Sequence, residues 1–337
     1  EISSYKNKNV GILGAGLSGL AAAKILYTSK ANLYIYDDQK NKPNNIRKNS
    51  WKNYKLWPWK TLNTIVVSPG IPINNKHKHK AIQLAIKNKV KIINEIDLFF
   101  ETSPKATIIG ITGTNGKSTT VALLFHILIL NKIKCVIGGN YGFPACEIID
   151  PGKDGVIILE LSSYQLDGAK KISLDLASIT NITPDHLDYH QTFCKYKLSK
   201  LKIINFLKKD GVFILNTKNN YLNEIASDKK YQSLNITKIK DNEFLSYVND
   251  NYYLRGLHNQ VNGSIAISIA RYLNITNEKI KSAIKHFKGL PHRMEPLHTS
   301  KRIKIINDSK STNGESTAAA LQSFENIYWI VGGQPKS

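Results

Sequence analysis

The sequence contains only three cysteines, Cys135, Cys146 and Cys194, and their spacing matches neither a metal site nor a disulfide framework. It also lacks any run of the roughly 18 apolar residues that a membrane-spanning helix requires. Its first residues do not form a cationic segment followed by an apolar stretch, as a signal peptide would. These absences argue against a membrane span and against a disulfide-stabilised secreted domain. We therefore expect a cytoplasmic protein in a reducing compartment.

Acidic residues are scarce as well, with 25 Asp and Glu against 47 Lys and Arg, which gives a net charge of +22. Such a charge can indicate a nucleic-acid partner, and residues 51–60, W-K-N-Y-K-L-W-P-W-K, interleave aromatic rings with lysines as a single-strand binder does. The lysines, however, are spread along the whole chain together with many Asn and Ile, so a general compositional bias explains the charge. We predict anionic small-molecule substrates and no nucleic-acid partner.

The length of 337 residues and the apolar content of 42% predict two or three domains of a soluble α/β protein. A strand is expected at residues 9–13, followed by G-A-G-L-S-G at 14–19, a helix at 20–29 and a second strand at 32–36 that ends in Asp37. This order is typical of a Rossmann-like nucleotide-binding unit. With a third strand at 64–67, the first domain is expected to end near residue 94. The motif alone would also suit a nicotinamide-dependent oxidoreductase.

A phosphate-binding loop is the most informative motif. The apolar run 106–111 leads into G-T-N-G-K-S-T-T at 113–120, and an amphipathic helix is predicted over 121–130. Backbone N–H groups at such a helix start bind anions, Lys117 adds a charge for the phosphates, and Ser118 offers a hydroxyl to Mg²⁺. Because Ile111 stands where the common motif has its first glycine, this is a variant loop. The motif predicts an ATP-using enzyme.

Two further strands end in polar residues, one at 155–160 with Glu160 and one at 176–181, before Asp185 and His186. Ligands of open parallel sheets bind at the carboxyl ends of strands, so Lys117, Glu160 and the 185–186 region are expected to converge. Glu160 is a candidate Mg²⁺ ligand opposite Ser118, unless it simply faces water. For His186, metal binding, substrate binding and a structural role all remain open.

Lys200 occupies an unusual position on a basic helix. At 100° per residue it shares one face with Phe193, Tyr196, Ile203, Ile204 and Leu207, whereas Lys195, Lys202 and Lys209 lie opposite. A buried ammonium needs a partner or loses its proton, and a neutral amine can react. The alternative is that Lys200 extends along the surface to reach water.

The remaining chain is expected to hold an irregular β region at 211–254, a helix at 259–273 and a connector at 289–293. A strand at 304–307, a helix near 317–323 and a strand at 328–331 would follow. About 40 residues are too few for an independent core. With the missing initiator Met, this suggests a fragment that ends inside its third domain.

Seven segments in order carry a resemblance: T-G-T-N-G-K-S-T (112–119), E-L-S-S-Y-Q-L (160–166), T-P-D-H-L-D (183–188), Y-K-L-S-K-L-K (196–202), L-H-N-Q-V-N (257–262), G-L-P-H-R (289–293) and N-D-S-K-S-T-N (307–313). They resemble the Mur ligases of bacterial peptidoglycan synthesis, which serve cell-wall biogenesis, cell shape and cell division. The combination of E-L-S-S-Y-Q-L, G-L-P-H-R and G-A-G-L-S-G is most similar to the branch that adds D-glutamate to UDP-N-acetylmuramoyl-L-alanine.

The resemblance implies a Rossmann-like domain for the UDP substrate (1–94), a central P-loop ATPase α/β domain (95–297) and an incomplete C-terminal α/β domain for the amino acid (298–337). It implies ATP-dependent amide formation through an acyl phosphate, two Mg²⁺ sites, a carbamylated Lys200 and a monomer. On this reading, residues 1–337 bind the UDP substrate but form no product, because family contacts to D-glutamate lie beyond Ser337.

The resemblance also assigns site residues. The catalytic group is Lys117, Glu160, His186 and Lys200, and the metal ligands are Ser118, Glu160, His186 and carbamylated Lys200. The ATP contacts are Gly113, Thr114, Asn115, Gly116, Lys117, Ser118, Thr119, Asn259, Asn262, Arg293 and Asp308. The UDP substrate is assigned Leu17, Ser18, Asp37, Gly70, Asn140, Gln165 and His186, and D-glutamate is assigned Lys310, Thr312 and Lys336.

Three alternatives to this reading stay open. One is a Mur ligase for a different amino acid, and another is an amide ligase similar to folylpolyglutamate synthase. The third is a truncated fragment that binds nucleotide without catalysis.

Overall fold

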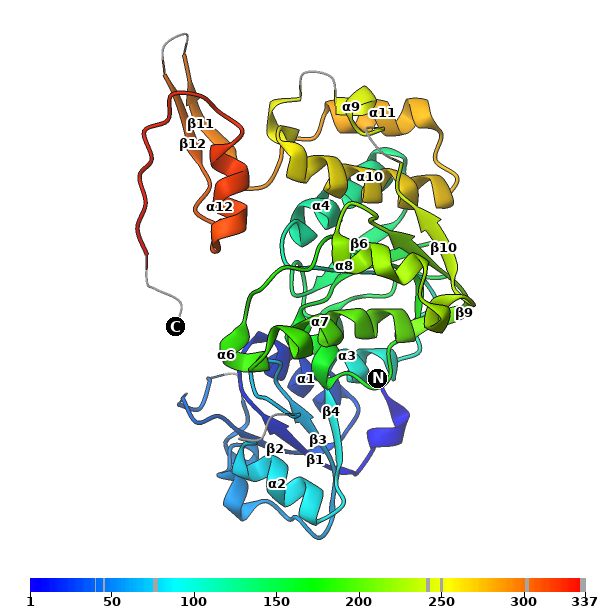
Figure 1. The fold of residues 1–337 in the computed structure, drawn as a ribbon. Coiled ribbons are helices and arrows are strands. Elements are labelled where there is room, and N and C mark those ends of the chain that lie inside the picture. The colour runs from blue at the N-terminus through cyan, green and yellow to red at the C-terminus, as the bar shows by residue number, and fades with distance from the viewer. Residues whose placement is uncertain are drawn as a thin grey trace. The chain divides into compact units, whose positions relative to one another are not determined.

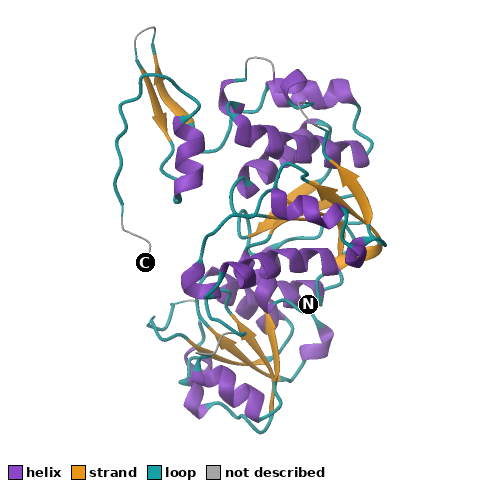
Figure 2. Ribbon diagram, viewed as in Figure 1, coloured by secondary structure: helices purple, strands orange, loops and turns teal. Residues whose placement is uncertain are grey.

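The computed structural model describes residues 1–39, 41–44, 46–74, 78–240, 243–248, 251–300 and 303–333. Helices and parallel strands alternate along most of the chain, which confirms the predicted α/β class (Figures 1 and 2). Residue contacts divide the chain into two compact units. One comprises Glu1–Gly110, Val136–Asp175 and Leu198–Lys209, and the other comprises Ile111–Cys135, Leu176–Lys197 and Asp210–Ser337. The division into three domains stays a prediction.

The first sheet has the order β2-β1-β3-β4, with β1 (Asn9–Leu13), β2 (Asn32–Tyr36), β3 (Leu62–Val67) and β4 (Lys91–Asn94) all parallel. The predicted bounds of β1 and β2 are confirmed. Parallel neighbours need a crossover, and α1 (Leu17–Thr28) joins β1 to β2 while α2 (Lys80–Lys87) precedes β4. Helix α1 begins three residues earlier than predicted, directly after Gly16.

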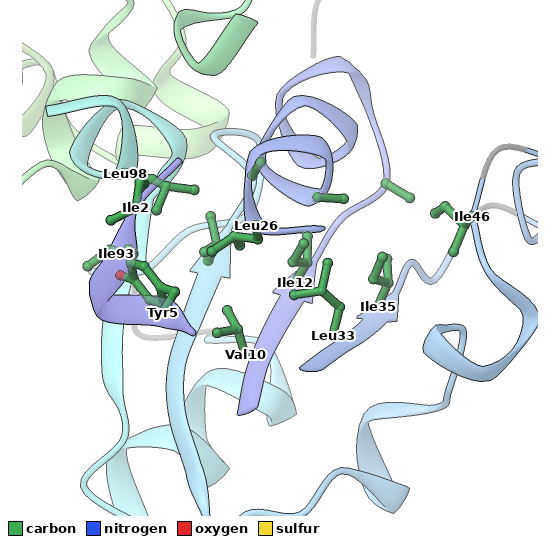
Figure 3. Packing of buried hydrophobic residues seen from close by; sticks show 14 residues of the cluster. Ile2, Tyr5, Val10, Ile12, Leu26, Leu33, Ile35, Ile46, Ile93 and Leu98 are labelled. Atoms are coloured by element: carbon green, nitrogen blue, oxygen red, sulfur yellow. The ribbon is translucent and has the colours of Figure 1, made fainter. Parts of the chain in front are cut away.

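Apolar side chains cover both faces of this sheet, as parallel sheets require. On one face Val10 and Ile12 of β1 pack with Leu33 and Ile35 of β2 and with Leu26 of α1 (Figure 3). The opposite face is covered by a second cluster that includes Leu13, Ile65, Tyr54, Trp57 and Ile82.

The aromatic and lysine-rich segment 51–60 belongs to this second cluster. Trp57 is only 3% exposed, its indole nitrogen donates to the Lys52 carbonyl at 3.0 Å, and Trp59 donates to the Tyr54 carbonyl at 2.9 Å. Any side chain at Gly11 would overlap the Trp57 ring. The rings therefore serve the core, which removes the reason for reading this segment as a single-strand binder.

The second sheet has the order β10-β9-β8-β5-β7-β6. Its strands are β5 (Thr107–Thr112), β6 (Cys135–Gly139), β7 (Val156–Glu160), β8 (Leu174–Ile179), β9 (Leu207–Leu215) and β10 (Asn235–Lys238). The predicted strands at 155–160 and 176–181 correspond to β7 and β8, the latter shifted by two residues. The longer helices that accompany these strands are α4 (Lys117–Leu130), α7 (Phe193–Leu201), α10 (Leu257–Tyr272) and α11 (Asn277–Lys285).

Helix α4 is not amphipathic, contrary to the prediction. Its residues Val121 to Leu124, Ile127 and Leu128 are buried, and it packs against α10 and α11. A helix covered on most sides carries apolar residues all round.

Short elements complete the description. They are α3 (Glu95–Phe100), α5 (Ser163–Gly168), α6 (Leu187–His190) and the 3₁₀ turns η1 (Ser3–Tyr5), η2 (Lys48–Ser50), η3 (Tyr54–Leu56), η4 (Ala145–Glu147) and η5 (Lys202–Phe206). No helix in the described ranges is long and apolar enough to cross a membrane.

The prediction of an irregular β region at 211–254 is largely wrong. Besides the end of β9 and the strand β10, the described part contains α8 (Asn220–Asn223), η6 (Glu224–Ala226), η7 (Lys229–Tyr231), α9 (Leu245–Val248) and η8 (Tyr252–Leu254). Successive short turns each bury one apolar side chain, such as Leu222, Ile225 and Tyr247. They therefore mimic the alternation of a strand.

At the C-terminal end, β11 (Glu295–Thr299) pairs antiparallel with β12 (Lys304–Asn307) and is followed by α12 (Gly314–Leu321). Strand β12 has its predicted bounds, whereas β11 was not predicted because E-P-L-H-T has no apolar alternation. The predicted strand at 328–331 is wrong: this stretch has no regular structure, and Tyr328 is 99% exposed. A strand needs a neighbour for its backbone hydrogen bonds, and no described segment pairs with these residues.

Candidate functional site: a phosphate loop and its cavity

The phosphate loop lies between β5 and α4, as predicted. Gly113 has φ 148° and Gly116, the N-cap of α4, has φ 83°, in the region that favours glycine. The space for a side chain is also taken, at Gly113 by the Thr180 hydroxyl and at Gly116 by the Asn262 amide. Both glycines are therefore required by backbone conformation and by close packing.

The two polar residues at the start of α4 face the loop region. Lys117 Nζ donates to the carbonyls of Gly113 at 2.9 Å and Thr114 at 2.8 Å. Ser118 is 8% exposed, and its Oγ accepts a hydrogen bond from Arg293 Nη2 at 3.2 Å. The structure thus brings together Ser118 and Arg293, which are 175 residues apart in the sequence.

Residues after β8 hold the loop in place. Thr114 Oγ1 lies 2.9 Å from Tyr196 Oη and donates to the Thr183 carbonyl at 3.1 Å. The backbone N–H of Asn115 donates to Asn181 Oδ1 at 2.9 Å. These bonds preorganise the loop before any ligand arrives.

A cavity of about 270 Å³ opens beside the loop, within the second compact unit. Two asparagines of α10 line it and are buried: Asn259 Nδ2 donates to the Arg255 carbonyl, and Asn262 Nδ2 donates to Asn259 Oδ1. Of the residues assigned from sequence, the cavity brings together Asn115, Gly116, Thr119, Asn259, Asn262, Arg293, Asp308 and Lys310.

Sequence reasoning missed several residues that line this cavity, among them Asn181, Tyr253 and His258. His258 Nδ1 is buried without a hydrogen-bond partner in the described structure, and burial lowers the pKa of this imidazole while the Asp308 carboxylate partly opposes the shift. Burial therefore favours the neutral form of this histidine. Its position directly before Asn259 was the one available signal.

A second group of predicted residues meets where β6 and β7 end. Glu160 is 1% exposed, its Oε1 accepts a hydrogen bond from Asn140 Nδ2 at 2.7 Å, and its Oε2 has no hydrogen-bond partner in the described structure. The reading of Glu160 as a residue that faces water is therefore wrong. A buried carboxylate oxygen without a donor fits a cation ligand. Asn140, assigned to the substrate, holds this carboxylate.

Gln165 also has a structural task. Its side-chain Oε1 accepts bonds from the N–H and the hydroxyl of Ser162 at 2.9 and 3.0 Å, and its own N–H donates to that hydroxyl at 3.2 Å. This capping box starts helix α5.

His186 adopts a left-handed backbone conformation, with φ 52° and ψ 38°, directly before α6. Its side chain is 37% exposed, and Nε2 lies 3.8 Å from Asp185 Oδ2. Among the described residues, no three His, Cys, Asp or Glu side chains form a group that could hold a metal ion.

Lys200 is 1% exposed and lies on α7 near the buried Tyr196, so the predicted inward orientation is confirmed. Lys195 and Lys209 are exposed, as predicted. The prediction for Lys202 is wrong, because its Nζ reaches the backbone carbonyls of Asp167 and Ala169.

Four of the residues assigned to the UDP substrate, Leu17, Ser18, Asp37 and Gly70, lie at the carboxyl end of the first sheet. Asp37 Oδ2 accepts the N–H of Ala15 in the glycine-rich loop at 2.7 Å, and Ser68 Oγ donates to the Gly14 carbonyl at 3.1 Å. Leu17 is 80% exposed at the start of α1, Ser18 is half-buried and Gly70 is exposed. The Asp37 carboxylate thus holds the glycine-rich loop through this hydrogen bond.

Of the residues assigned to D-glutamate, Lys310 and Thr312 are exposed in the loop between β12 and α12. Lys336 lies outside the described residues.

Comparisons with known proteins identify the family of this chain. The sequence profile of the Mur ligase middle domain matches residues 111–277, and that of the MurD-like N-terminal domain of Mur ligases matches residues 8–94. The UDP-N-acetylmuramoylalanine–D-glutamate ligase of Rickettsia bellii is 35% identical and covers 98% of this chain and 78% of its own length. The chain belongs to the Mur ligase family. The corresponding ligase of Agrobacterium fabrum is 31% identical over all of this Mur ligase and 77% of its own length.

Solved structures share the fold of this Mur ligase. A MurF ligase from Thermotoga maritima in complex with ADP has a TM-score of 0.56 at 15% identity, covering 96% of this chain and 74% of its own. The UDP-N-acetylmuramate–alanine ligase MurC of the same organism has a TM-score of 0.54 at 16% identity, covering 94% and 77%. A MurF from Acinetobacter baumannii matches over 65% of its own chain, with a TM-score of 0.55. The resemblance drawn from the motifs is thus confirmed.

Proposed function

We propose that this Mur ligase joins D-glutamate to UDP-N-acetylmuramoyl-L-alanine at the expense of ATP, in the cytoplasmic synthesis of peptidoglycan precursors. The observation that carries this proposal is the 31 to 36% identity, over nearly the whole chain, with ligases named for that reaction. The cavity beside the phosphate loop supplies a place for the nucleotide.

In the proposed reaction the substrate carboxylate attacks the γ-phosphate of ATP, which gives an acyl phosphate and ADP. The amine of D-glutamate then attacks the acyl carbon and displaces phosphate. Lys117 and the N–H groups at the start of α4 hold the phosphates, and Arg293, bonded to Ser118, adds a fixed charge beside them. Asn259, Asn262 and Asp308 form the other wall of the nucleotide cavity.

Two Mg²⁺ ions would be held by oxygen ligands. Ser118 and Glu160 are proposed for the first, because the Glu160 Oε2 atom is buried and lacks a donor. When bound, the ions offset the repulsion between an anionic nucleophile and an anionic phosphate. Asn140 orients Glu160 through its 2.7 Å hydrogen bond to the other carboxylate oxygen.

Lys200 is proposed to carry a carbamate, formed when its neutral amine adds to CO₂ and releases a proton. Its near-complete burial supports this, because desolvation disfavours the ammonium form. The carbamate and His186 would hold the second Mg²⁺.

The two ends of the UDP substrate would contact different segments. Leu17, Ser18, Asp37 and Gly70 are proposed for the UDP end, and His186, Asn140 and Gln165 for the muramoyl end. Because the Gln165 side chain already caps α5, its contribution would come through its remaining amide hydrogens. Lys310, Thr312 and Lys336 are proposed for D-glutamate, and the protein is proposed to act as a monomer.

The decisive experiment offers the protein ATP, Mg²⁺, UDP-N-acetylmuramoyl-L-alanine and a panel of D- and L-amino acids, and measures phosphate release and the ligated product. Product with D-glutamate alone is expected from the full-length protein, with phosphate released in equal amount. Product with another amino acid would assign a different Mur ligase activity. Binding of ATP and the UDP substrate by calorimetry, without turnover for any amino acid, would indicate a non-catalytic binding protein.

A further inference from the structure

Helix α5 ends where several side chains from elsewhere in the first compact unit converge. The last carbonyls of a helix have no partner within it. Lys202 Nζ donates to one of them, Asp167 O, at 2.9 Å, and to the carbonyl of Ala169, the C-cap residue after α5, at 2.8 Å. Asn74 Nδ2 donates to Asp167 O from another side, at 3.0 Å.

The residues that follow α5 are held by a buried carboxylate. Asp97 is fully buried, and its Oδ1 accepts the N–H groups of Lys170 and Lys171, both at 2.7 Å. Its Oδ2 accepts the N–H of Asn94 in the capping box of α3. Residues 167–171 are therefore fixed by a lysine, a carboxylate and an amide.

Lys202 is suited to this position by its charge. A cation near a helix C-terminus is favoured by the helix dipole, and an ammonium supplies three donors, of which two are used here. Removing the ammonium would take this donor from the Ala169 carbonyl and leave the Asp167 carbonyl with Asn74 alone.

This contact joins two parts of the proposed active site. Lys202 follows Lys200 by two residues at the start of η5, and the N-cap of α5, Ser162, follows Glu160 by two residues. The turn η5 packs directly on α5. A six-residue helix capped at both ends therefore lies between the Glu160 segment and the Lys200 segment.

We propose that Lys202 is a positioning residue, which ties the segment of Lys200 to the end of α5 and so sets the distance between the Lys200 and Glu160 side chains. The inference rests on the proposed function, in which these two side chains serve neighbouring Mg²⁺ ions. Residues that orient metal ligands without touching the metal typically change metal affinity or activity by about 10- to 100-fold when replaced.

The first test uses the protein without ligands. Hydrogen exchange of the α5 amides is measured for Lys202→Met, Lys202→Arg and Lys209→Met, the last being an exposed lysine on β9. We expect exchange in α5 to rise about tenfold or more in Lys202→Met, because its C-terminal donors are lost. Lys202→Arg, which keeps donors and charge, and Lys209→Met should resemble the wild type. Unchanged exchange in Lys202→Met would overturn the proposed tie.

The second test measures kcat, the KM values and the Mg²⁺ concentration for half-maximal rate. We expect kcat of Lys202→Met to fall about 10- to 100-fold with a raised Mg²⁺ requirement, and Lys202→Arg to recover most of the rate. The KM for the UDP substrate should change little. Faster exchange in α5 with normal kcat and normal Mg²⁺ dependence would reduce Lys202 to a purely structural role and refute the inference. An inactive full-length wild type would refute the proposed function instead, while the exchange result still decides whether the Lys202 contact orders α5.

Discussion

The buried carboxyl of Glu95 leads to a prediction about stability. Glu95 is the first residue of α3 and is 1% exposed. One of its oxygens accepts the N–H of Cys146 at 2.5 Å, and the other has no hydrogen-bond partner in the described structure. Burial, with a smaller contribution from the Glu147 carboxylate, raises the pKa of Glu95 from its ordinary value of 4.5 to about 7, although the bonds from Cys146 oppose the shift.

The sign of the effect follows from the direction of this shift. Between pH 4.5 and about 7 the folded protein binds a proton at Glu95 that the unfolded chain has already lost. The free energy of unfolding therefore falls as the pH rises through this window. A rise of about 2.5 pKa units corresponds to about 3 kcal/mol in full, since one unit is worth about 1.4 kcal/mol. The side chain of Glu95→Gln cannot ionise and keeps an oxygen for the Cys146 N–H. The free energy of unfolding of this variant should therefore not fall in this way.

Urea unfolding of the wild type and Glu95→Gln at pH 5 and pH 8 tests the prediction. Relative to the wild type, the free energy of unfolding of Glu95→Gln should rise by about 2 to 3 kcal/mol from pH 5 to pH 8. Glu224→Gln is the matched control, because Glu224 is an exposed carboxylate at the start of η6, away from Glu95 in the sequence. A stability difference between Glu95→Gln and wild type that does not change with pH would refute the reasoning, since it would mean that Glu95 is ionised in the folded protein at both pH values.

Three further predictions concern the phosphate loop, the buried lysine and the core. Lys117→Ala should abolish ATP-dependent phosphate release with little change in the thermal midpoint, because Lys117 lies at the loop; retained turnover would remove it from the mechanism. Lys200→Ala should be inactive and partly restored by short carboxylic acids that occupy the carbamate position, and normal activity at limiting Mg²⁺ would contradict the proposed metal site. Trp57→Ala should lower the free energy of unfolding by about 3 to 5 kcal/mol, because it empties the space over Gly11; a loss below about 1 kcal/mol, measured by urea unfolding, would show that the ring is not part of a packed core.

Local signals explain which parts of the fold could be predicted. The strands at 9–13 and 32–36 have their predicted bounds because each is a short apolar run beside a glycine-rich turn or an acidic residue. The phosphate loop was found because its glycines meet a backbone requirement at Gly113 and Gly116. Strand β11 was missed and a strand at 328–331 was wrongly predicted, because a strand depends on a partner that sequence periodicity does not reveal.

The candidate site, too, could be predicted only in part. Sequence motifs identified Lys117, Ser118 and Glu160 as groups for phosphate and Mg²⁺, and helical periodicity placed Lys200 on the buried face of α7. Neither signal identified the cavity position of His258 or the hydrogen bond from Asn140 to Glu160, because both depend on how distant elements pack.

Lys202 illustrates the physical reason most clearly. On the helical projection Lys202 lies opposite Lys200. A helical projection gives the direction of a side chain only as far as the helix continues. The α-helix ends at Leu201, and the four-carbon side chain of Lys202 then reaches the carbonyls at the end of α5. The sequence by itself determined which chemical groups this Mur ligase possesses and the bounds of strands such as β1, β2 and β12. Tertiary packing decided which groups meet, because the partner of a long, flexible side chain depends on the elements that fold against it.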